Sequence, residues 1–165
     1  MPEKAIFGLG NPYRSDDNIG LIIIDNLQKK HSNNPELSFY KLEIEIFGLE
    51  HIFSTNKNFK RVLFIDAVQK TEQLPPGTTF AFKAEQIDQN SALFATITHN
   101  IGILELIKLY QQTNPKILPP DITFIGIVAD DLTFGENLSD IVSNTILEVE
   151  KSIERWIKGE EIVNY

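Results

Sequence analysis

Residues 4–30 of the chain read KAIFGLGNPYRSDDNIGLIIIDNLQKK, and this stretch decides the fold. Its apolar start, residues 4–9, stops at Gly10-Asn11-Pro12, which predicts a buried strand that ends in a turn. Apolar side chains then recur at helical spacing from Ile19 to Leu27, so residues 17–30 are predicted to form an amphipathic helix. Asp16 stands where this helix begins, and we expect it to be the N-cap.

The same alternation of strand and helix continues along the chain. Further strands are predicted at 37–46, 60–66, 78–83 and 121–128, and further helices at 48–56, 101–112 and 139–158, with a tail from residue 159. The connection from Gln69 to Gly77 is too short for a helical crossover, so the strand at 78–83 is expected to be antiparallel to its predecessor. The pattern predicts one α/β domain over residues 1–165, with a largely parallel sheet covered on both faces.

Composition and charge narrow the classes of function. The chain has 165 residues and no cysteine, which excludes disulfides, thiolate metal ligands and a cysteine nucleophile. A formal net charge of −8 argues against nucleic acid and anionic membranes as partners and suits metals or basic peptides better. Neither a signal peptide nor an apolar run long enough to span a bilayer is visible. We therefore expect a cytoplasmic, soluble protein.

Polar groups at the carboxyl ends of the strands mark the expected site, because ligands of open α/β sheets bind there. Asp17 follows the first strand, Asp66 follows the apolar run at 60–66, and His99 precedes the helix at 101–112. Two carboxylates and an imidazole suit nickel, zinc, iron or manganese, and three protein ligands leave positions open for catalysis. Each residue also has a structural explanation: Asp17 suits a first helical turn, and His99 suits a helix start.

The sequence does not match the glycine motif of dinucleotide-binding proteins or the serine motif of hydrolases. Gly8-Leu9-Gly10 suggests a dinucleotide-binding turn, but Tyr13 stands where the third glycine belongs. These glycines are better explained as letting the turn lie close to the sheet edge. The sequence has no Gly-x-Ser-x-Gly motif, so serine catalysis has no support.

Three segments resemble the hydrogenase maturation proteases: FGLGNPYRSDDNIG (7–20), FIDAV (64–68) and THNIG (98–102). GIVADDLTFGENLS (126–139) resembles the late strand and loop of that family. The resemblance implies a three-layer α/β/α sandwich with a five-stranded, mostly parallel twisted sheet and one antiparallel strand, of the phosphorylase/hydrolase-like kind. It also implies an endopeptidase that removes the C-terminal peptide of a nickel–iron hydrogenase large-subunit precursor after nickel insertion.

The resemblance also assigns roles to residues. Asp17, Asp66 and His99 match the metal-contacting, catalytic positions, and Gly10, Asn11, Asp16 and Gly48 match the substrate loops. It implies that nickel is sensed in the substrate, where the precursor's own cysteines hold it, without a permanently bound cofactor, although other divalent metals can occupy the site. The expected partner is the precursor, and the expected state is a monomer.

Two departures from the family pattern keep alternatives open. Asn18 stands where the family often has glycine, and residues 43–48 replace a glycine-rich loop, of which only Gly48 remains. A checkpoint protein that binds nickel or the nickel-bearing precursor without cutting it is therefore an alternative. Peptidyl-tRNA hydrolases share the Gly-Leu-Gly-Asn-Pro start, but the histidine that they need shortly afterwards is missing here.

Overall fold

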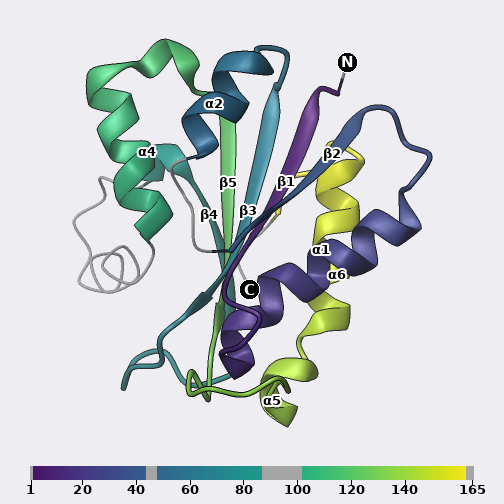
Figure 1. Ribbon diagram of the computed structural model, residues 1–165, viewed down its shortest axis with the longest axis vertical. Helices are drawn as coiled ribbons and strands as arrows, with labels where there is room; N and C mark the ends of the chain where they lie inside the picture. The colour runs from purple at the N-terminus through teal and green to yellow at the C-terminus, as the bar shows by residue number, and fades with distance from the viewer. Residues whose placement is uncertain (1, 44–47, 87–101, 163–165) are drawn as a thin grey trace.

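A computed structural model describes residues 2–43, 48–86 and 102–162 and shows one five-stranded sheet in the order β2-β1-β3-β5-β4 (Figure 1). Four strands run parallel to one another: β1 (Lys4–Leu9), β2 (Leu37–Leu42), β3 (Arg61–Val68) and β5 (Asp121–Val128). The fifth strand, β4 (Thr79–Lys83), is antiparallel to β5, as the short connection before it predicts. The predicted fold class is confirmed.

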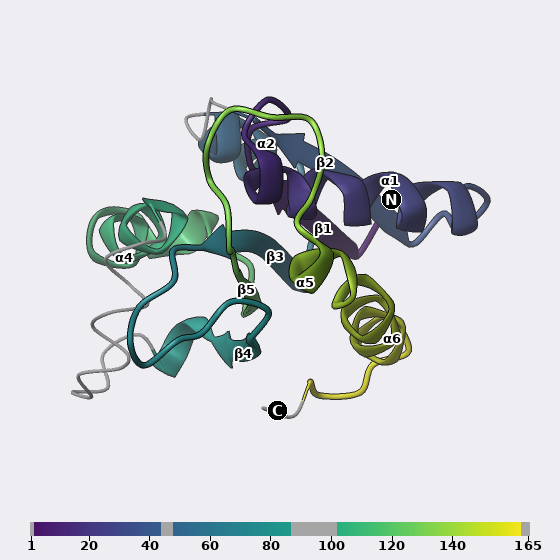
Figure 2. The same cartoon turned by 90° about the horizontal axis from the view of Figure 1, so that it is seen from below.

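Helices cover both faces of this sheet (Figures 1 and 2). The short 3-10 helix η1 (Ser15–Asn18) leads into α1 (Ile19–Lys30), which lies with α5 (Asp140–Ser143) and α6 (Ile146–Ile157) on one face. The opposite face carries α2 (Gly48–Thr55) and α4 (Gly102–Thr113). Two further 3-10 turns, η2 (Ala84–Gln86) and η3 (Pro115–Ile117), complete the described elements. No helix within the described ranges has the length and apolarity needed to cross a membrane.

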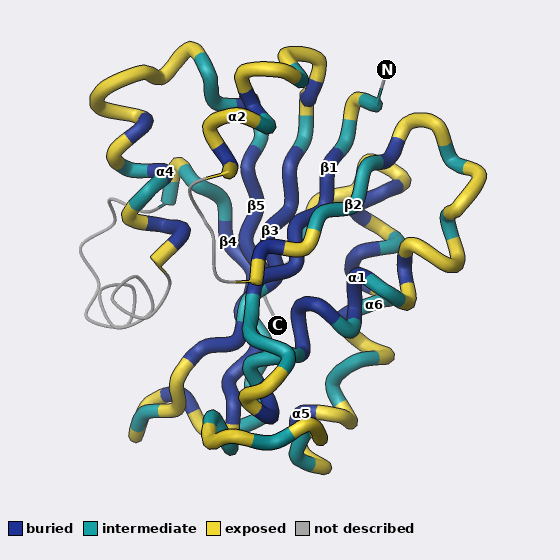
Figure 3. The backbone as a smooth tube through the Cα atoms, viewed as in Figure 1, coloured by how far each residue is buried: buried dark blue, intermediate teal, exposed yellow. Residues whose placement is uncertain are grey.

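The strand interiors are buried, as Figure 3 shows, and their side chains alternate between two apolar cores. On β3, Val62 and Phe64 pack toward α2 and α4, whereas Leu63 and Ile65 pack toward α1 and α6. A row of stacked rings crosses the whole sheet on the first of these faces, with centroids 4.8–5.3 Å apart in each successive pair: Tyr40, Phe7, Phe64, Phe124 and Phe82. This row fixes the register of all five strands.

Three predicted boundaries are wrong. β2 ends at Leu42, and residues 44–46 of the predicted strand lie outside the described residues. β3 continues through Val68, so that Asp66 lies inside the strand opposite Gly126. The predicted helix at 139–158 is two helices, because the chain breaks at Asn144-Thr145. There the amide and the hydroxyl of Thr145 both donate to the carbonyl of Val142, which tightens the turn.

The backbones of β1 and α1 touch at two glycines. A Cβ on Gly8 would lie 2.4 Å from the carbonyl oxygen of Gly20, and a Cβ on Gly20 would lie 2.5 Å from that of Leu9 and 2.7 Å from that of Ile65. A real Cβ cannot approach backbone atoms so closely. The start of α1 therefore rests directly on the carboxyl ends of β1 and β3.

Gly20→Ala is expected to destabilise the fold by about 2 kcal/mol or more, since its methyl group would collide with two backbone carbonyls. In an open helical site the same change stabilises by up to about 1 kcal/mol, so its sign is diagnostic. Gly48→Ala in α2 is the matched control, because nothing lies within 4 Å of its Cβ position. Urea unfolding of both variants measures the difference. Equal stability of the two variants would contradict the close approach.

Candidate active site

Asp17 lies in η1, at the point where the chain turns from β1 into α1. Gly10 makes this turn possible: its φ is +146°, and a Cβ there would lie 1.8 Å from the carbonyl oxygen of Asp17. The backbone amide of Asn11 donates a hydrogen bond to the Asp17 carboxylate. Gly10 and Asn11, both expected in the substrate loop, thus hold Asp17 in place, and Asp17 itself is only partly buried.

Asp66 lies near the carboxyl end of β3, the middle strand of the sheet. Its residue is partly buried, between the fully buried Ile65 and the buried Ala67. Gly20 lets the start of α1 lie against the backbone carbonyl of Ile65. The η1 turn, which directly precedes α1, therefore lies beside Asp66. The structure thus brings together two of the three predicted site residues.

The two carboxyl groups are near enough for the charge of Asp17 to act on Asp66. Burial, and after it the negative charge of Asp17, raise the pKa of Asp66 to about 8, while a hydrogen bond from the backbone of Ala67 acts in the opposite direction. Burial also raises the pKa of Asp17, opposed by the positive charge of Arg14 and by the Asn11 amide. A carboxyl group titrating near neutral pH can hold or release a proton during a reaction.

Two other predicted positions cannot be compared in the same way. His99 lies among residues 87–101, outside the described residues, and so do positions 44–47 of the divergent loop. Gly48 is described and begins α2, with open space around it. Among residues 2–43, 48–86 and 102–162, no group of three or more acidic or histidine side chains is arranged to hold a metal ion. The third ligand proposed from the sequence therefore stays a prediction.

Asp16 differs from its predicted role. It is fully buried and is not a helix N-cap, since Arg14 and Asn18 hold the cap positions of η1 and α1. Its Oδ1 accepts the amide of Ser139 at 2.7 Å, and its Oδ2 accepts the amides of Asp130 and Asp131 and the hydroxyl of Ser139, each at 2.8 Å. We call this arrangement the Asp16 clamp. It faces inward from the substrate loop and ties the β1–α1 loop to the β5–α5 loop.

The clamp could not be found by spacing, because its partners lie 114–123 residues away. The available signal was the polar run at the end of the strand at 121–128, where Asp130 and Asp131 stand. Their backbone amides, and not their side chains, turned out to matter for the clamp. The side chain of Asp130 instead pairs with Lys70 at 2.8 Å.

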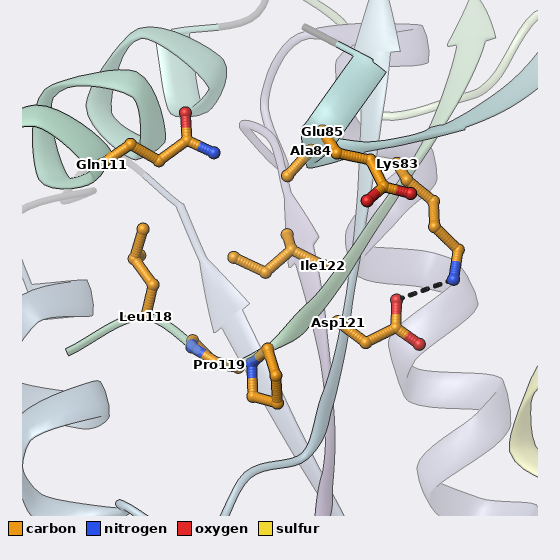
Figure 4. A pocket seen from close by; sticks show the side chains of 9 residues that line it. Lys83, Ala84, Glu85, Gln111, Leu118, Pro119, Asp121 and Ile122 are labelled. Carbon is orange, nitrogen blue, oxygen red and sulfur yellow. Dashed lines mark ion pairs between the residues drawn. The ribbon is translucent and has the colours of Figure 1, made fainter. Parts of the chain in front are cut away.

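A hollow of about 310 Å³ lies at the opposite, amino edge of the sheet, where β5 begins and β4 ends (Figure 4). Lys83 and Asp121 pair across its wall at 3.1 Å. Asp121 pairs with Arg61 at the start of the neighbouring strand β3. Asp66 lies five residues beyond Arg61 in that strand, toward the carboxyl edge. The hollow is therefore separate from the acidic pair, and no residue predicted for the site lines it.

The family description of hydrogenase maturation proteases matches residues 47–156, which is more than half of the chain. The chain belongs to the hydrogenase maturation protease family. Membership makes it a hydrolase of the peptidase class, and it sets aside the alternative of a peptidyl-tRNA hydrolase. The matched range includes Asp66 and His99 but not Asp17.

Individual relatives agree with the family. The chain is similar to the [NiFe] hydrogenase maturation protease HybD from Thermococcus kodakarensis, with 27% identity, a TM-score of 0.66 and coverage of 94% of this chain and 99% of that one. An endopeptidase from Escherichia coli shares the fold, with a TM-score of 0.74 at 19% identity over 99% of this chain and 96% of that one. Protein FrxA of Pyrococcus furiosus is 24% identical over 131 residues, which are 79% of this chain and 88% of that protein.

In this hydrogenase maturation protease, Asp66→Asn is expected to stabilise the fold at pH 8 and to leave it nearly unchanged at pH 4. The raised pKa means that the folded state keeps a proton on Asp66 that the unfolded state loses above about pH 4, so wild-type stability falls as the pH rises toward 8. Asparagine carries no charge and avoids this penalty, a gain on the order of 2 kcal/mol at pH 8. Urea midpoints at both pH values measure it.

Asp25→Asn is the control for this experiment, because Asp25 pairs with Lys41 on the surface and its side chain is about half exposed. Its midpoint should differ from that of the wild type by a similar small amount at both pH values. A gain for Asp66→Asn that was equal at pH 4 and pH 8 would contradict the raised pKa of Asp66.

Asp16→Asn is expected to destabilise the protein by about 2–3 kcal/mol. The side-chain NH2 group of asparagine would face N–H and O–H groups that donate hydrogen bonds to the carboxylate of Asp16. The clamp holds residues 129–139, so limited proteolysis of the variant should also cut there first. Chemical unfolding and mass spectrometry of the fragments provide the two readouts. A variant as stable and as protease-resistant as Asp25→Asn would show that the clamp is dispensable.

Proposed function

We propose that this protease removes the C-terminal peptide of a nickel–iron hydrogenase large-subunit precursor after nickel insertion. The observation that carries the proposal is the convergence of Asp17 and Asp66 at the carboxyl edge of the sheet, where burial and, after it, the charge of Asp17 raise the pKa of Asp66. The similarity to the HybD protease of Thermococcus kodakarensis supports the class of substrate. Family membership supports the reaction, a peptide-bond hydrolysis.

The acidic pair fits a divalent cation. The two carboxyl groups lie near each other in a partly buried place, and the raised pKa of both shows the cost of charging them there. A cation between them relieves that cost, and an imidazole such as that of His99 completes a ligand set typical of nickel. We infer that the ion is the substrate's own nickel, met by Asp17, Asp66 and His99, and that no cofactor is permanently bound.

The roles of the chain's residues follow from this arrangement. Nickel held by the precursor polarises an oxygen that it contacts, which is the chemistry that the ion supplies when it is present. Asp17 and Asp66 orient the precursor through that ion, so that the scissile bond lies at the edge of the sheet. Without the ion, Asp66 holds a proton near neutral pH. Contact with nickel would release that proton, because a carboxyl group that binds a metal is deprotonated. A cytoplasmic monomer remains our expectation for the state in which this happens.

The test uses the purified protease and the large-subunit precursor encoded in the same genome, loaded with nickel or nickel-free. Intact-mass spectrometry should show a shortened large subunit only with the nickel-loaded precursor. Asp17→Asn, Asp66→Asn and His99→Ala should each lower the processing rate at least a hundredfold, since each removes a proposed ligand. Asp25→Asn, a surface carboxylate paired with Lys41, should process at the wild-type rate.

Three results are decisive in this experiment. Equal processing of the nickel-free precursor would refute nickel sensing. Tight binding of the loaded precursor with an intact tail would establish the checkpoint alternative that the divergent 43–48 loop suggests. Normal processing by His99→Ala would remove that residue from the site and leave only the two carboxylates.

A further inference from the structure

The β1–α1 and β5–α5 loops are joined along their backbones at the carboxyl edge (Figure 2). Arg14 and Gly135 form a parallel bridge, in which Gly135 donates to the carbonyl of Tyr13 at 3.0 Å and accepts from Ser15 at 2.9 Å. Asp16 donates to the carbonyl of Asp131 at 3.0 Å, in addition to the Asp16 clamp described above. The two loops therefore behave as one unit.

This unit carries the two most exposed large hydrophobic side chains of the described residues. Phe134 is 87% exposed and Tyr13 is 67% exposed. Each directly precedes one of the bridged residues, Gly135 and Arg14, so both side chains stand on the joined part of the two loops. We call these two residues the aromatic pair. Single exposed hydrophobic residues are common, but two highly exposed aromatic residues on a pair of joined loops are typical of a binding surface.

Bracing removes the simplest alternative explanation, that the rings are exposed because their loops are loose. The side chain of Arg14 donates to the carbonyl of Leu132 at 3.0 Å, and the amide and hydroxyl of Thr133 donate to the side chain of Asp131 at 2.8 and 2.6 Å. Residues 131, 132, 133 and 135 each make a hydrogen bond, and Phe134 lies between two of them. Rigid aromatic side chains lose little entropy on binding, which favours them as anchors at protein interfaces.

The position of the aromatic pair points to its partner. Tyr13 is in the same loop as Asp17, four residues before it, and the Asp16 clamp ties the loop of Phe134 to the same turn. A polypeptide whose metal centre reaches Asp17 and Asp66 extends across this edge. Residues 129–140 contain four acidic residues and no basic one. Lys70 pairs with Asp130, and Arg14 adds one positive charge beside Tyr13, but the joined loops keep an excess of negative charge. This excess disfavours an anionic bilayer and favours a segment with basic residues.

We propose that Tyr13 and Phe134 bind an apolar side chain of the precursor protein, within a segment that also carries positive charge, beside the proposed cleavage site. The identity of the partner rests on the proposed function. The aromatic pair contributes affinity and selects the precursor, and it takes no part in the hydrolysis.

Nickel-free precursor separates this contact from the metal site, because it can bind the pair but presents no nickel to Asp17 and Asp66. The Tyr13→Ala/Phe134→Ala double variant should weaken binding of the nickel-free precursor at least tenfold in Kd, measured by biolayer interferometry. With nickel-loaded precursor, the kcat/KM of the double variant should fall by a similar factor, because KM rises while kcat stays unchanged. Tyr13→Phe and Phe134→Tyr should restore most of the affinity.

Leu147→Ala is the matched control, since Leu147 is 62% exposed but lies on α6, away from both loops. It should leave the Kd unchanged, and all variants should unfold near the wild-type temperature, because the replaced side chains are exposed. An unchanged Kd and KM in the double variant, with normal processing by the wild type, would overturn the inference and leave the proposed function standing.

The remaining outcomes also distinguish the two proposals. If the wild type binds the precursor but never cuts it, the proposed function fails, and a tenfold loss of affinity in the double variant still supports the aromatic pair. If the double variant loses only self-association in sedimentation, with its Kd for the precursor unchanged, the pair contacts a second copy of the chain and the inference fails.

Discussion

The site depends on a backbone contact, the approach of α1 to β1 and β3 through Gly20. Without a side chain at this position, the carbonyls of Leu9 and Ile65 meet the helix directly. Ile65 immediately precedes Asp66, and Gly20 follows Asp17 by three residues. The contact therefore sets the separation of the two carboxylates before any ligand is present. The free energy needed to bury these two carboxyl groups near each other comes from packing elsewhere in the domain.

Much of the fold could be predicted from the sequence, because buried strands and amphipathic helices leave a local periodic signal. Asp17 and Asp66 could be selected from the rule that ligands bind at the carboxyl ends of strands, and the structure brings the two residues near each other at that edge. The division of the last helix was missed because the hydrogen bonds of Thr145 to Val142 depend on the local backbone and do not disturb the apolar spacing.

The role of Asp16 could not be predicted from the sequence for a different reason. An aspartate before a helix fits an N-cap on propensity alone. Whether its carboxylate instead meets backbone amides 114 or more residues away depends on where two loops cross above the sheet. Adjacent aspartates consequently have opposite environments: Asp16 is saturated with donors and buried, whereas Asp17 keeps its carboxylate for the site.

The Asp16 clamp has a consequence for how proteins of this architecture can diverge. An insertion in either loop would pull backbone amides away from a buried carboxylate, and an uncompensated buried charge is costly. Changes of loop length at this edge therefore lower the stability of the fold. Replacement of the outward side chains at positions 13 and 134 changes that stability very little. Recognition can drift from one partner to another by exchanging two side chains on a constant scaffold, without disturbing the chemistry a few residues away.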